Sequence, residues 1–431
     1  MKRKNPGLFT GLCGFVCMAL AFSGCLQPDS EEPEIRGLEI TSGGNPVSVL
    51  DIDPGESVTL EVSDPDLPPG SAASFIAGTD SAAFSVARSG PSYTITGITP
   101  GGMGLAAFSG RGKTGTVRVF IRNWAQGEVV NRHTLYADGD TSRGGAYKLV
   151  TDAGFHYEAP DGLSSGVPKT MYHAVHNTDH ITQQYDDELK KNVFAFSLHY
   201  DPANPAAADG DMNSGFPDRQ RLELKTMNTG PFDAGKPEDL MYSTGGGDTF
   251  THRWKFRLPR DFAVSTEFTH IHQIKPEGGD AGNPVFSLTA RRKSDGSTVM
   301  QLIYRGPLRP SGDPSQNSYP CEVKLRDFLG EWVRVEETIT YDNPGAYQFK
   351  VVRIRDLKVL MHYVYFPQKY EEKKYLDPFV TYRQGNTYIR PKFGFYRRIR
   401  HLDSFSVVAG DVLDLKDETI LYADFELEKL K

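Results

Sequence analysis

Three short stretches far apart in the chain carry residue types that could bind and deprotonate an anionic substrate. They are residues 219–225, 270–275 and 392–397. Each alternates polar with apolar residues, so in an extended strand its charged members point to one face while the others pack behind. A groove with Arg, Lys, Gln, His and Tyr but few carboxylates suits a substrate whose carboxylate must be neutralised and whose proton must be removed. Uronic-acid polysaccharides fit that description.

The elements that must position these residues are strands. From 124 to 431 the sequence is rich in aromatic residues and alternating segments, and it has no long amphipathic helix. One domain of roughly 300 residues built this way predicts two large stacked sheets, a concanavalin-like β jelly roll. Its concave sheet would present one residue in two to a groove. The stretches 201–217 and 306–320, rich in Pro, Gly and Asp, are predicted to be loops that wall this groove.

The chain opens with the layout of a bacterial export signal. Three basic residues, Lys2 to Lys4, precede an apolar run over 8–22 that ends near Cys25. The segment before Cys25 resembles a lipobox, so we interpret 1–25 as a lipoprotein signal peptide and Cys25 as the lipidated first residue of the mature protein. An ordinary signal peptide cut nearby is the alternative. The run is shorter than the ~20 residues that span a bilayer, which disfavours a transmembrane anchor.

Residues 26–34 follow Cys25 as an acidic, Pro-containing tether, similar to those of surface-displayed bacterial lipoproteins. We therefore expect a cell-envelope protein that is lipid-anchored to the outer membrane and either surface-exposed or periplasmic.

Residues 35–123 predict a separate small β-sandwich, because short runs rich in Val, Ile, Thr and Phe alternate with turn residues and show no helical period. The order Asp53-Pro-Gly-Glu-Ser-Val-Thr-Leu, Ile95-Thr-Gly-Ile-Thr-Pro-Gly-Gly and Val117-Arg-Val resembles bacterial immunoglobulin-like domains of group 2. Such a domain is expected to hold the next one away from the membrane, with weak carbohydrate binding as the alternative.

Charge and cysteine content exclude several partners and sites. The formal net charge of −7 argues against nucleic acid. Cys13 and Cys17 leave with the signal and Cys25 takes lipid, so only Cys321 remains in the folded part, which excludes an intrachain disulfide and a Cys-based metal site. We expect a monomer that binds an anionic polysaccharide and requires no cofactor. No metal site is predicted, with Ca²⁺ at the acidic loops 209–211 and 246–248 left open.

The three stretches also match a known family, in the same order along the chain. Arg221-Leu-Glu-Leu-Lys, Gln273-Ile-Lys and Lys392-Phe-Gly-Phe-Tyr resemble the signatures Arg-x-Glu-x-Arg, Gln-x-His and Tyr-Phe-Lys-x-Gly-x-Tyr of jelly-roll polysaccharide lyases of the alginate lyase type. The last stretch, together with Gly330-Glu-Trp-Val-Arg-Val and Tyr422-Ala-Asp-Phe-Glu, is closer to the heparin lyase and glucuronan lyase branch.

The resemblance implies β-elimination in a uronic-acid-containing polysaccharide, which leaves unsaturated uronate ends. Gln273 and Arg221 would donate hydrogen bonds where the enolate charge develops. Tyr396 would be the base, the acid to the leaving oxygen, or both, with Lys392 favouring its ionised form. Glu223 would fix a neighbouring cation. The other predicted substrate-binding residues are Lys275, Lys225, Arg219, His272 and Arg397.

One position departs from the family pattern. Lys275 stands where the alginate lyase signature has histidine, so it would be a second carboxylate neutraliser. The proton-accepting histidine must then come from elsewhere. His199 is the first candidate, because alternation along its strand could place it on the groove face. His270 and His272 point away from Gln273 in a regular strand and need a bulge to join it.

Two other functions remain open. A non-catalytic carbohydrate-binding surface lipoprotein would keep the groove without the chemistry, and the missing histidine after Gln273 favours it. A sandwich-fold glycoside hydrolase would need two carboxylates ~5 to ~9.5 Å apart. Its candidates are the alternating acids Asp424, Glu426 and Glu428, which lie in the last predicted strand without the order of a hydrolase motif.

Overall fold

The computed structural model describes the protein from Gly37 to Lys431, with gaps. The described residues are 37–68, 75–122, 127–142, 144–160, 162–163, 179–200, 209–210, 218–226, 241–265, 267–307, 317–365, 379–399 and 415–431. The predicted signal, Cys25, the tether and the predicted domain boundary at 123/124 lie outside them, as does most of the predicted loop 201–217. No helix within the described ranges is long and apolar enough to cross a membrane.

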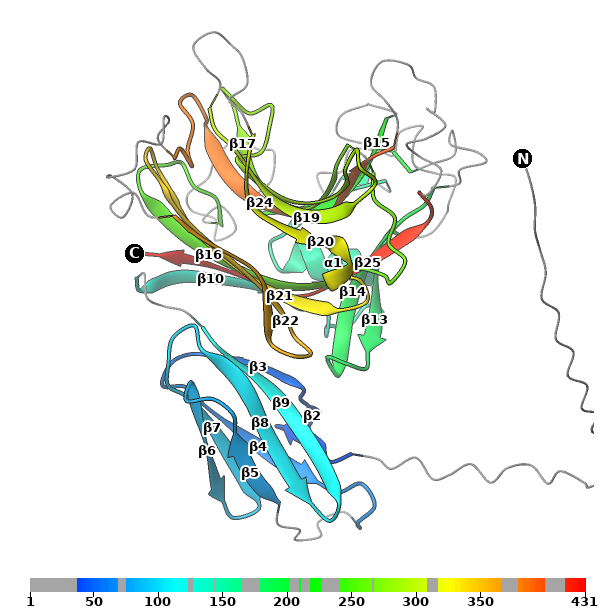
Figure 1. The fold of residues 1–431 in the computed structure, drawn as a ribbon, viewed down its shortest axis with the longest axis vertical. Helices are drawn as coiled ribbons and strands as arrows, with labels where there is room; N and C mark the ends of the chain where they lie inside the picture. Colours follow the sequence, from blue (N-terminus) through cyan, green and yellow to red (C-terminus); the bar gives the residue numbers. More distant parts are fainter. Residues whose placement is uncertain are drawn as a thin grey trace, which may run out of the picture.

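Nine strands form the N-terminal part. They are β1 (Glu39–Ser42), β2 (Asn45–Pro46), β3 (Val49–Ile52), β4 (Ser57–Ser63), β5 (Ile76–Thr79), β6 (Phe84–Ser89), β7 (Ser92–Gly97), β8 (Met103–Gly110) and β9 (Lys113–Ile121). Two sheets, β2-β1-β4-β7-β6 and β3-β9-β8-β5, stack on each other, as the blue and cyan strands of Figure 1 show. Every second residue of β7 is buried, and Tyr93 and Ile95 pack in the shared core with Leu60 and Val117.

Sixteen further strands form a larger sandwich. They are β10 (Val129–Leu135), β11 (His156–Ala159), β12 (Gly162–Leu163), β13 (Ile181–Asp186), β14 (Lys191–Leu198), β15 (Arg219–Lys225), β16 (Asp248–Arg257), β17 (Thr269–Glu277), β18 (Phe286–Arg292), β19 (Thr298–Arg305), β20 (Asn317–Lys324), β21 (Trp332–Tyr341), β22 (Ala346–Arg353), β23 (Lys358–Tyr365), β24 (Tyr388–Arg398) and β25 (Glu418–Leu430). Among the described residues the helices are α1 (Gly145–Asp152) and the short η3 (Leu325–Asp327).

These strands make two eight-stranded sheets. The inner sheet has the order β12-β11-β15-β24-β17-β18-β19-β20. The outer sheet has the order β13-β14-β25-β16-β21-β22-β23, with β10 paired to β25. Trp254, Phe393 and Phe425 lie in the apolar core between the sheets. The predicted all-β class, with a small sandwich followed by a large one, is confirmed. The predicted loop 306–320 is wrong at its end, because β20 begins at Asn317.

The inner sheet curves so that its concave face points away from the outer sheet (Figure 1). We call this surface the concave face. Gly394 lets β24 lie close to β15 there. Its φ of 152° favours glycine, and a Cβ atom at this position would collide with the backbone of Leu222 and Glu223. Gly394 thereby fixes the strand that carries Lys392 and Tyr396.

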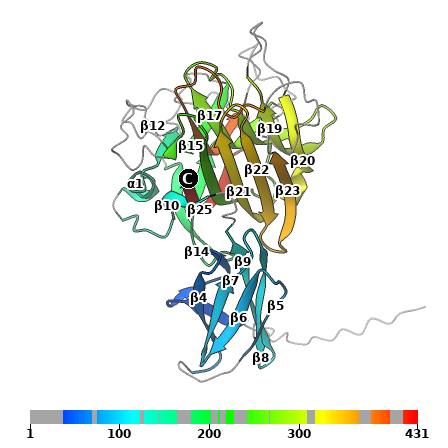
Figure 2. The same ribbon diagram turned by 90° about the vertical axis from the view of Figure 1, so that its left-hand side faces the viewer.

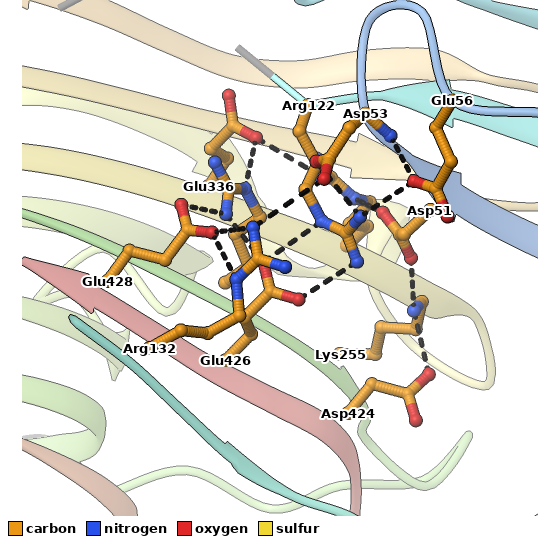
Figure 3. A network of polar contacts seen from close by, with 12 residues as sticks. Asp51, Asp53, Glu56, Arg122, Arg132, Lys255, Glu336, Asp424, Glu426 and Glu428 are labelled. Carbon is orange, nitrogen blue, oxygen red and sulfur yellow. Dashed lines mark hydrogen bonds and ion pairs between the residues drawn. The ribbon is translucent and has the colours of Figure 1, made fainter. Parts of the chain in front are cut away.

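The N-terminal sandwich packs on the outer sheet, on the side opposite the concave face (Figures 1 and 2). Phe120 meets Trp332 and Val352 in an apolar cluster. Beside this cluster lies a buried ionic network that joins the two sandwiches (Figure 3). Asp51 contacts Lys255 at 2.7 Å and Arg334 at 2.6 Å, and its pKa is lowered because these cations outweigh the effect of burial. We call this ionic network the interface network. Its members are Asp51, Asp53, Glu56, Arg122, Arg132, Arg253, Lys255, Arg334, Glu336, Asp424, Glu426 and Glu428.

Candidate active site

The three sequence stretches meet at the centre of the inner sheet. Strand β24 lies between β15 and β17, and the pairing aligns their residues in rows. In one row Arg221, Tyr396 and His270 are direct neighbours across the three strands. In a second row Lys225, Lys392 and Gln273 are neighbours in the same way. The alternate residues of the same strands, such as Leu222, Leu224, Phe393 and Phe395, pack into the core, so both rows lie on the opposite side of the sheet, the concave face.

Tyr396 is surrounded by two guanidinium groups. Arg219 Nη1 donates a hydrogen bond to the Tyr396 hydroxyl at 3.1 Å. The Arg221 guanidinium carbon lies 3.8 Å from the centre of the Tyr396 ring. Two adjacent cations can stabilise negative charge that develops on its oxygen during a reaction. Tyr396 is therefore placed to exchange a proton with a bound substrate.

A β-bulge in β17 brings His270 to Tyr396. The register of β17 shifts between His270 and His272 against both neighbouring strands, so His270 and Gln273 share the concave face although three positions separate them. The ring centres of His270 and Tyr396 are 5.9 Å apart. The expectation that His270 needs a bulge to join Gln273 is therefore confirmed.

The surroundings of His270 keep its imidazole neutral. Its Nδ1 lies 2.7 Å from Thr289 Oγ1, which itself donates to Ser287 Oγ. Thr289 Oγ1 therefore accepts from Nδ1–H, and the basic lone pair is on Nε2. Burial, followed by the charges of Arg305 and Arg291, lowers the pKa of His270 well below its ordinary value. At neutral pH this side chain can accept a proton.

Two buried carboxylates hold the cations of the concave face in place. Glu158, on β11, accepts hydrogen bonds from Lys225 at 2.8 Å, Lys392 at 2.7 Å and Arg221 at 3.2 Å. Burial opposes its ionisation, but these cations prevail and hold the pKa of Glu158 well below its ordinary value. Glu223 accepts from Arg221 at 2.8 Å, which agrees with its expected role of fixing a cation.

Lys275 adds a positive charge to the same surface. Its ammonium group donates to the carbonyl of Ala281 and forms no ion pair with a carboxylate among the described residues. Burial, followed by repulsion from Lys392, lowers the pKa of Lys275 to about 8. Next to it, Gln273 Nε2 donates to Glu223 Oε1. Lys275 is thus charged at neutral pH, and a bound anion would supply the opposite charge that it lacks.

Two predicted substrate-binding residues lie on the wrong face of the sheet. His272 is 1% exposed and contacts Glu337 in the core through Nε2 at 2.9 Å, because the bulge turns it inward. Arg397 follows Tyr396 and therefore points to the core side, where its Nε donates to Gln220 Oε1 at 2.7 Å. Complete burial lowers the pKa of Arg397 to about 10.

The structure places His199 in another polar cluster. It follows β14 of the outer sheet, and its Nδ1 lies 3.0 Å from Asp209 Oδ2. Its carbonyl accepts from Gln220 Nε2 at 2.6 Å. His270, not His199, is therefore the histidine that packs against Tyr396 in the described part of the chain. Alternation along β14 was a poor guide, because His199 lies beyond the end of that strand.

The remaining predicted acids are engaged in ion pairs away from the concave face. Asp424, Glu426 and Glu428 belong to the interface network and contact Lys255 and Arg253 at 2.6 to 2.7 Å. Of the acidic loops considered for calcium, Asp248 pairs with Lys429 at 3.0 Å, and Asp211 lies outside the described residues.

Glu158 was not predicted from the sequence, because its strand carries no motif. Strand β11 is four residues long and reads His-Tyr-Glu-Ala. Only its pairing opposite Glu223 brings the Glu158 carboxylate to three cations. A lone acid in a short strand offers no signal of such a role before the sheet is known.

No family model and no curated protein matches the chain. Solved structures with a similar arrangement include the endo-β-1,4-glucuronan lyase of the fungus Trichoderma reesei, at 13% identity and a TM-score of 0.36, over 64% of this chain and 94% of that one. An alginate lyase of Pseudomonas aeruginosa matches at 16% identity and a TM-score of 0.35, over 63% and 96%. An alginate lyase of Klebsiella pneumoniae matches at 12% identity and a TM-score of 0.37, over 64% and 94%. At such low values the chemistry must be argued from the residues of the concave face.

Proposed function

We propose that the protein is a polysaccharide lyase that cleaves a uronic-acid-containing polymer by β-elimination on the concave face. The observation that carries this proposal is the row Arg221, Tyr396 and His270, in which a tyrosine hydroxyl bonded by Arg219 lies beside a neutral histidine. A proton acceptor and a proton donor then flank one point of an anionic chain.

The proposed reaction begins with neutralisation of the uronate carboxylate. Arg221, Gln273 and Lys275 supply positive charge and hydrogen-bond donors at this surface. They lower the barrier to removal of the C5 proton, because they stabilise the enolate charge that develops on the carboxylate. The excess of cations over carboxylates here favours a polyanion over a neutral glycan.

Proton transfer then completes the elimination. His270 Nε2 takes the C5 proton, the C4–C5 double bond forms, and the C4–oxygen bond breaks. Tyr396 gives its hydroxyl proton to the departing oxygen, with the resulting phenolate stabilised by Arg219 and Arg221. Transfer of the C5 proton from His270 to Tyr396 through solvent restores both groups, so the cycle consumes no water.

The carboxylates of the concave face do not suit hydrolysis. A glycoside hydrolase needs one carboxyl group with a raised pKa to protonate the leaving oxygen. Glu158 has the opposite shift, and Glu223 is bonded to Arg221 and Gln273. Both therefore act as anchors for cations in this proposal.

The test is an ultraviolet assay of the purified protein with alginate, glucuronan, heparin, heparan sulfate, chondroitin sulfate and ulvan. A lyase produces a rising absorbance from unsaturated uronate on at least one polymer, which also identifies the substrate. Binding to a polymer without any rise in absorbance would overturn the proposal and favour the non-catalytic carbohydrate-binding function. New reducing ends without absorbance would indicate hydrolysis.

A further inference from the structure

Two histidines and an aspartate meet at one edge of the large sandwich, away from the rows of the concave face. His180 directly precedes β13, His199 directly follows β14, and Asp209 joins them from later in the chain. His180 Nε2 and His199 Nδ1 each lie 3.0 Å from Asp209 Oδ2. One nitrogen from each ring and one carboxylate oxygen all lie within 4.8 Å of one another.

Within the described part of the chain, the second carboxylate oxygen of this cluster has no hydrogen-bond partner. Asp209 is 1% exposed, yet its Oδ1 bonds to none of the described residues. Buried polar atoms in proteins are nearly always satisfied, so an orphaned carboxylate oxygen needs a partner such as an ion or water.

A second cluster of one carboxylate and two histidines has partners for both of its carboxylate oxygens. In the core, Glu337 Oε2 accepts from His252 at 2.8 Å and from His272 at 2.9 Å. Its other oxygen accepts from the Tyr347 hydroxyl at 2.6 Å. Both oxygens of Glu337 are thus hydrogen-bonded, whereas Oδ1 of Asp209 has no partner among the residues that the structure describes. The two clusters differ in the feature that a metal ion would supply.

We propose that His180, His199 and Asp209 bind a divalent transition-metal ion, with Zn²⁺ as the preferred metal. Two imidazole nitrogens and one carboxylate are ligands that Zn²⁺ accepts in a tetrahedral site. Bonds of ~2.0–2.2 Å from an ion between the three ligand atoms need only a small closure of the cluster. His199 retains a side-chain exposure of 20%, which leaves water access to the fourth position.

The ion would act as a support for the strand that carries the arginines. The carbonyl of His199 accepts from Gln220, and Gln220 lies between Arg219 and Arg221 in β15. A metal at His199 would therefore fix the edge of the sandwich against β15. This role does not depend on the reaction proposed for the concave face, so a failure of either proposal leaves the other intact.

The test uses the full chain without a polyhistidine tag, dialysed first against a chelator and then against Zn²⁺. We expect about one tightly held Zn²⁺ per chain by elemental analysis, and a melting temperature several degrees higher with the ion than with the chelator. Asp209→Asn should lose both the bound ion and the chelator response. Glu337→Gln is the matched control, which should lower the melting temperature but keep the bound ion.

Two results would overturn the metal site. If the wild-type chain retains no Zn²⁺, and its melting temperature is the same with Zn²⁺ and with chelator, the cluster is a hydrogen-bonded one only. If Asp209→Asn binds Zn²⁺ as tightly as the wild type, the ion lies elsewhere. Because the wild-type measurement needs no substitution, a variant that fails to fold does not prevent a decision.

Discussion

The concave face and the interface network are built from the same residue types but balance their charges differently. In the interface network each cation contacts at least two carboxylates, as Arg253 does with Glu336, Glu426 and Glu428. On the concave face two carboxylates, Glu158 and Glu223, share Arg221, Lys225 and Lys392. Among the described residues Lys275 bonds a carbonyl and no carboxylate. The cations of the interface network are thus neutralised within the protein. The concave face keeps an excess of positive charge, which a bound anion would neutralise.

This difference separates a structural network from a reactive one. Buried ion pairs fix geometry at a desolvation cost that close partners must offset. Buried cations with too few carboxylate partners lower the free energy of unfolding, and such arrangements are typical of functional sites. We therefore expect substitutions on the concave face to reduce activity at little cost in stability, and substitutions in the interface network to do the reverse.

The largest expected effect is at Tyr396. Tyr396→Phe removes the hydroxyl that protonates the leaving oxygen, so the elimination rate should fall ~10²–10⁴-fold or more while polymer binding persists. The rate is measured by ultraviolet absorbance and binding by calorimetry. Tyr388→Phe, on the same strand, is the control and should keep most of the activity. A fully active Tyr396→Phe protein would exclude the proposed acid.

His270→Gln tests the base. Because His270 supplies the basic nitrogen, the elimination rate should fall ~10²–10³-fold, and the loss should exceed that of His199→Gln at least ~10-fold. The wild type should also keep its activity well below the ordinary histidine pKa of ~6.5, since the pKa of His270 is lowered. A larger loss in His199→Gln than in His270→Gln would reverse the assignment.

Asp51→Asn addresses the interface network. It leaves Lys255 and Arg334 short of a carboxylate, so the free energy of unfolding should fall by about 3 kcal/mol. The elimination rate should be unchanged at temperatures where the variant is folded. Asp356→Asn, which breaks an exposed pair with Arg353, is the control and should cost less than about 1 kcal/mol. Equal losses in the two variants would mean that the interface network adds no stability.

Lys275→Met should give the smallest effect, and it should stabilise the fold where Asp51→Asn destabilises it. The pKa of Lys275 is lowered to about 8, so below pH 8 the folded state carries the full cost of a buried charge. That cost is relieved as pH rises above 8 and disappears above the unfolded pKa of ~10.5. Removing the charge should therefore raise the free energy of unfolding by on the order of 1–2 kcal/mol at neutral pH and weaken polymer binding.

The same lysine predicts how binding depends on pH. Lys275 attracts an anion only while it is charged, so polymer affinity of the wild type should decrease as pH rises through about 8. Lys275→Met should lack this step. A wild-type affinity that stays constant across this range would indicate that Lys275 does not contact the polymer.

Alternation in the sequence was enough to predict the sandwiches and the meeting of three strands. Alternation failed to predict side-chain directions where a β-bulge adds one residue to a strand and reverses which residues face the groove. The bulge of β17 sends His270 to the concave face and His272 to the core, and no residue type in that stretch marks the extra position. Arg397 was grouped with Tyr396 because a basic run conceals which face each member takes. Glu158 became visible only through the sheet pairing, which no local pattern encodes.

The most direct test of the proposed chemistry is mass spectrometry of the products formed from the preferred polymer in water labelled with heavy oxygen. β-Elimination predicts that each oligosaccharide with a newly formed non-reducing end lacks one water molecule relative to the hydrolysis product, and that cleavage itself introduces no label. Products with the full mass of hydrolysis and one labelled oxygen for each cleaved bond would contradict the account.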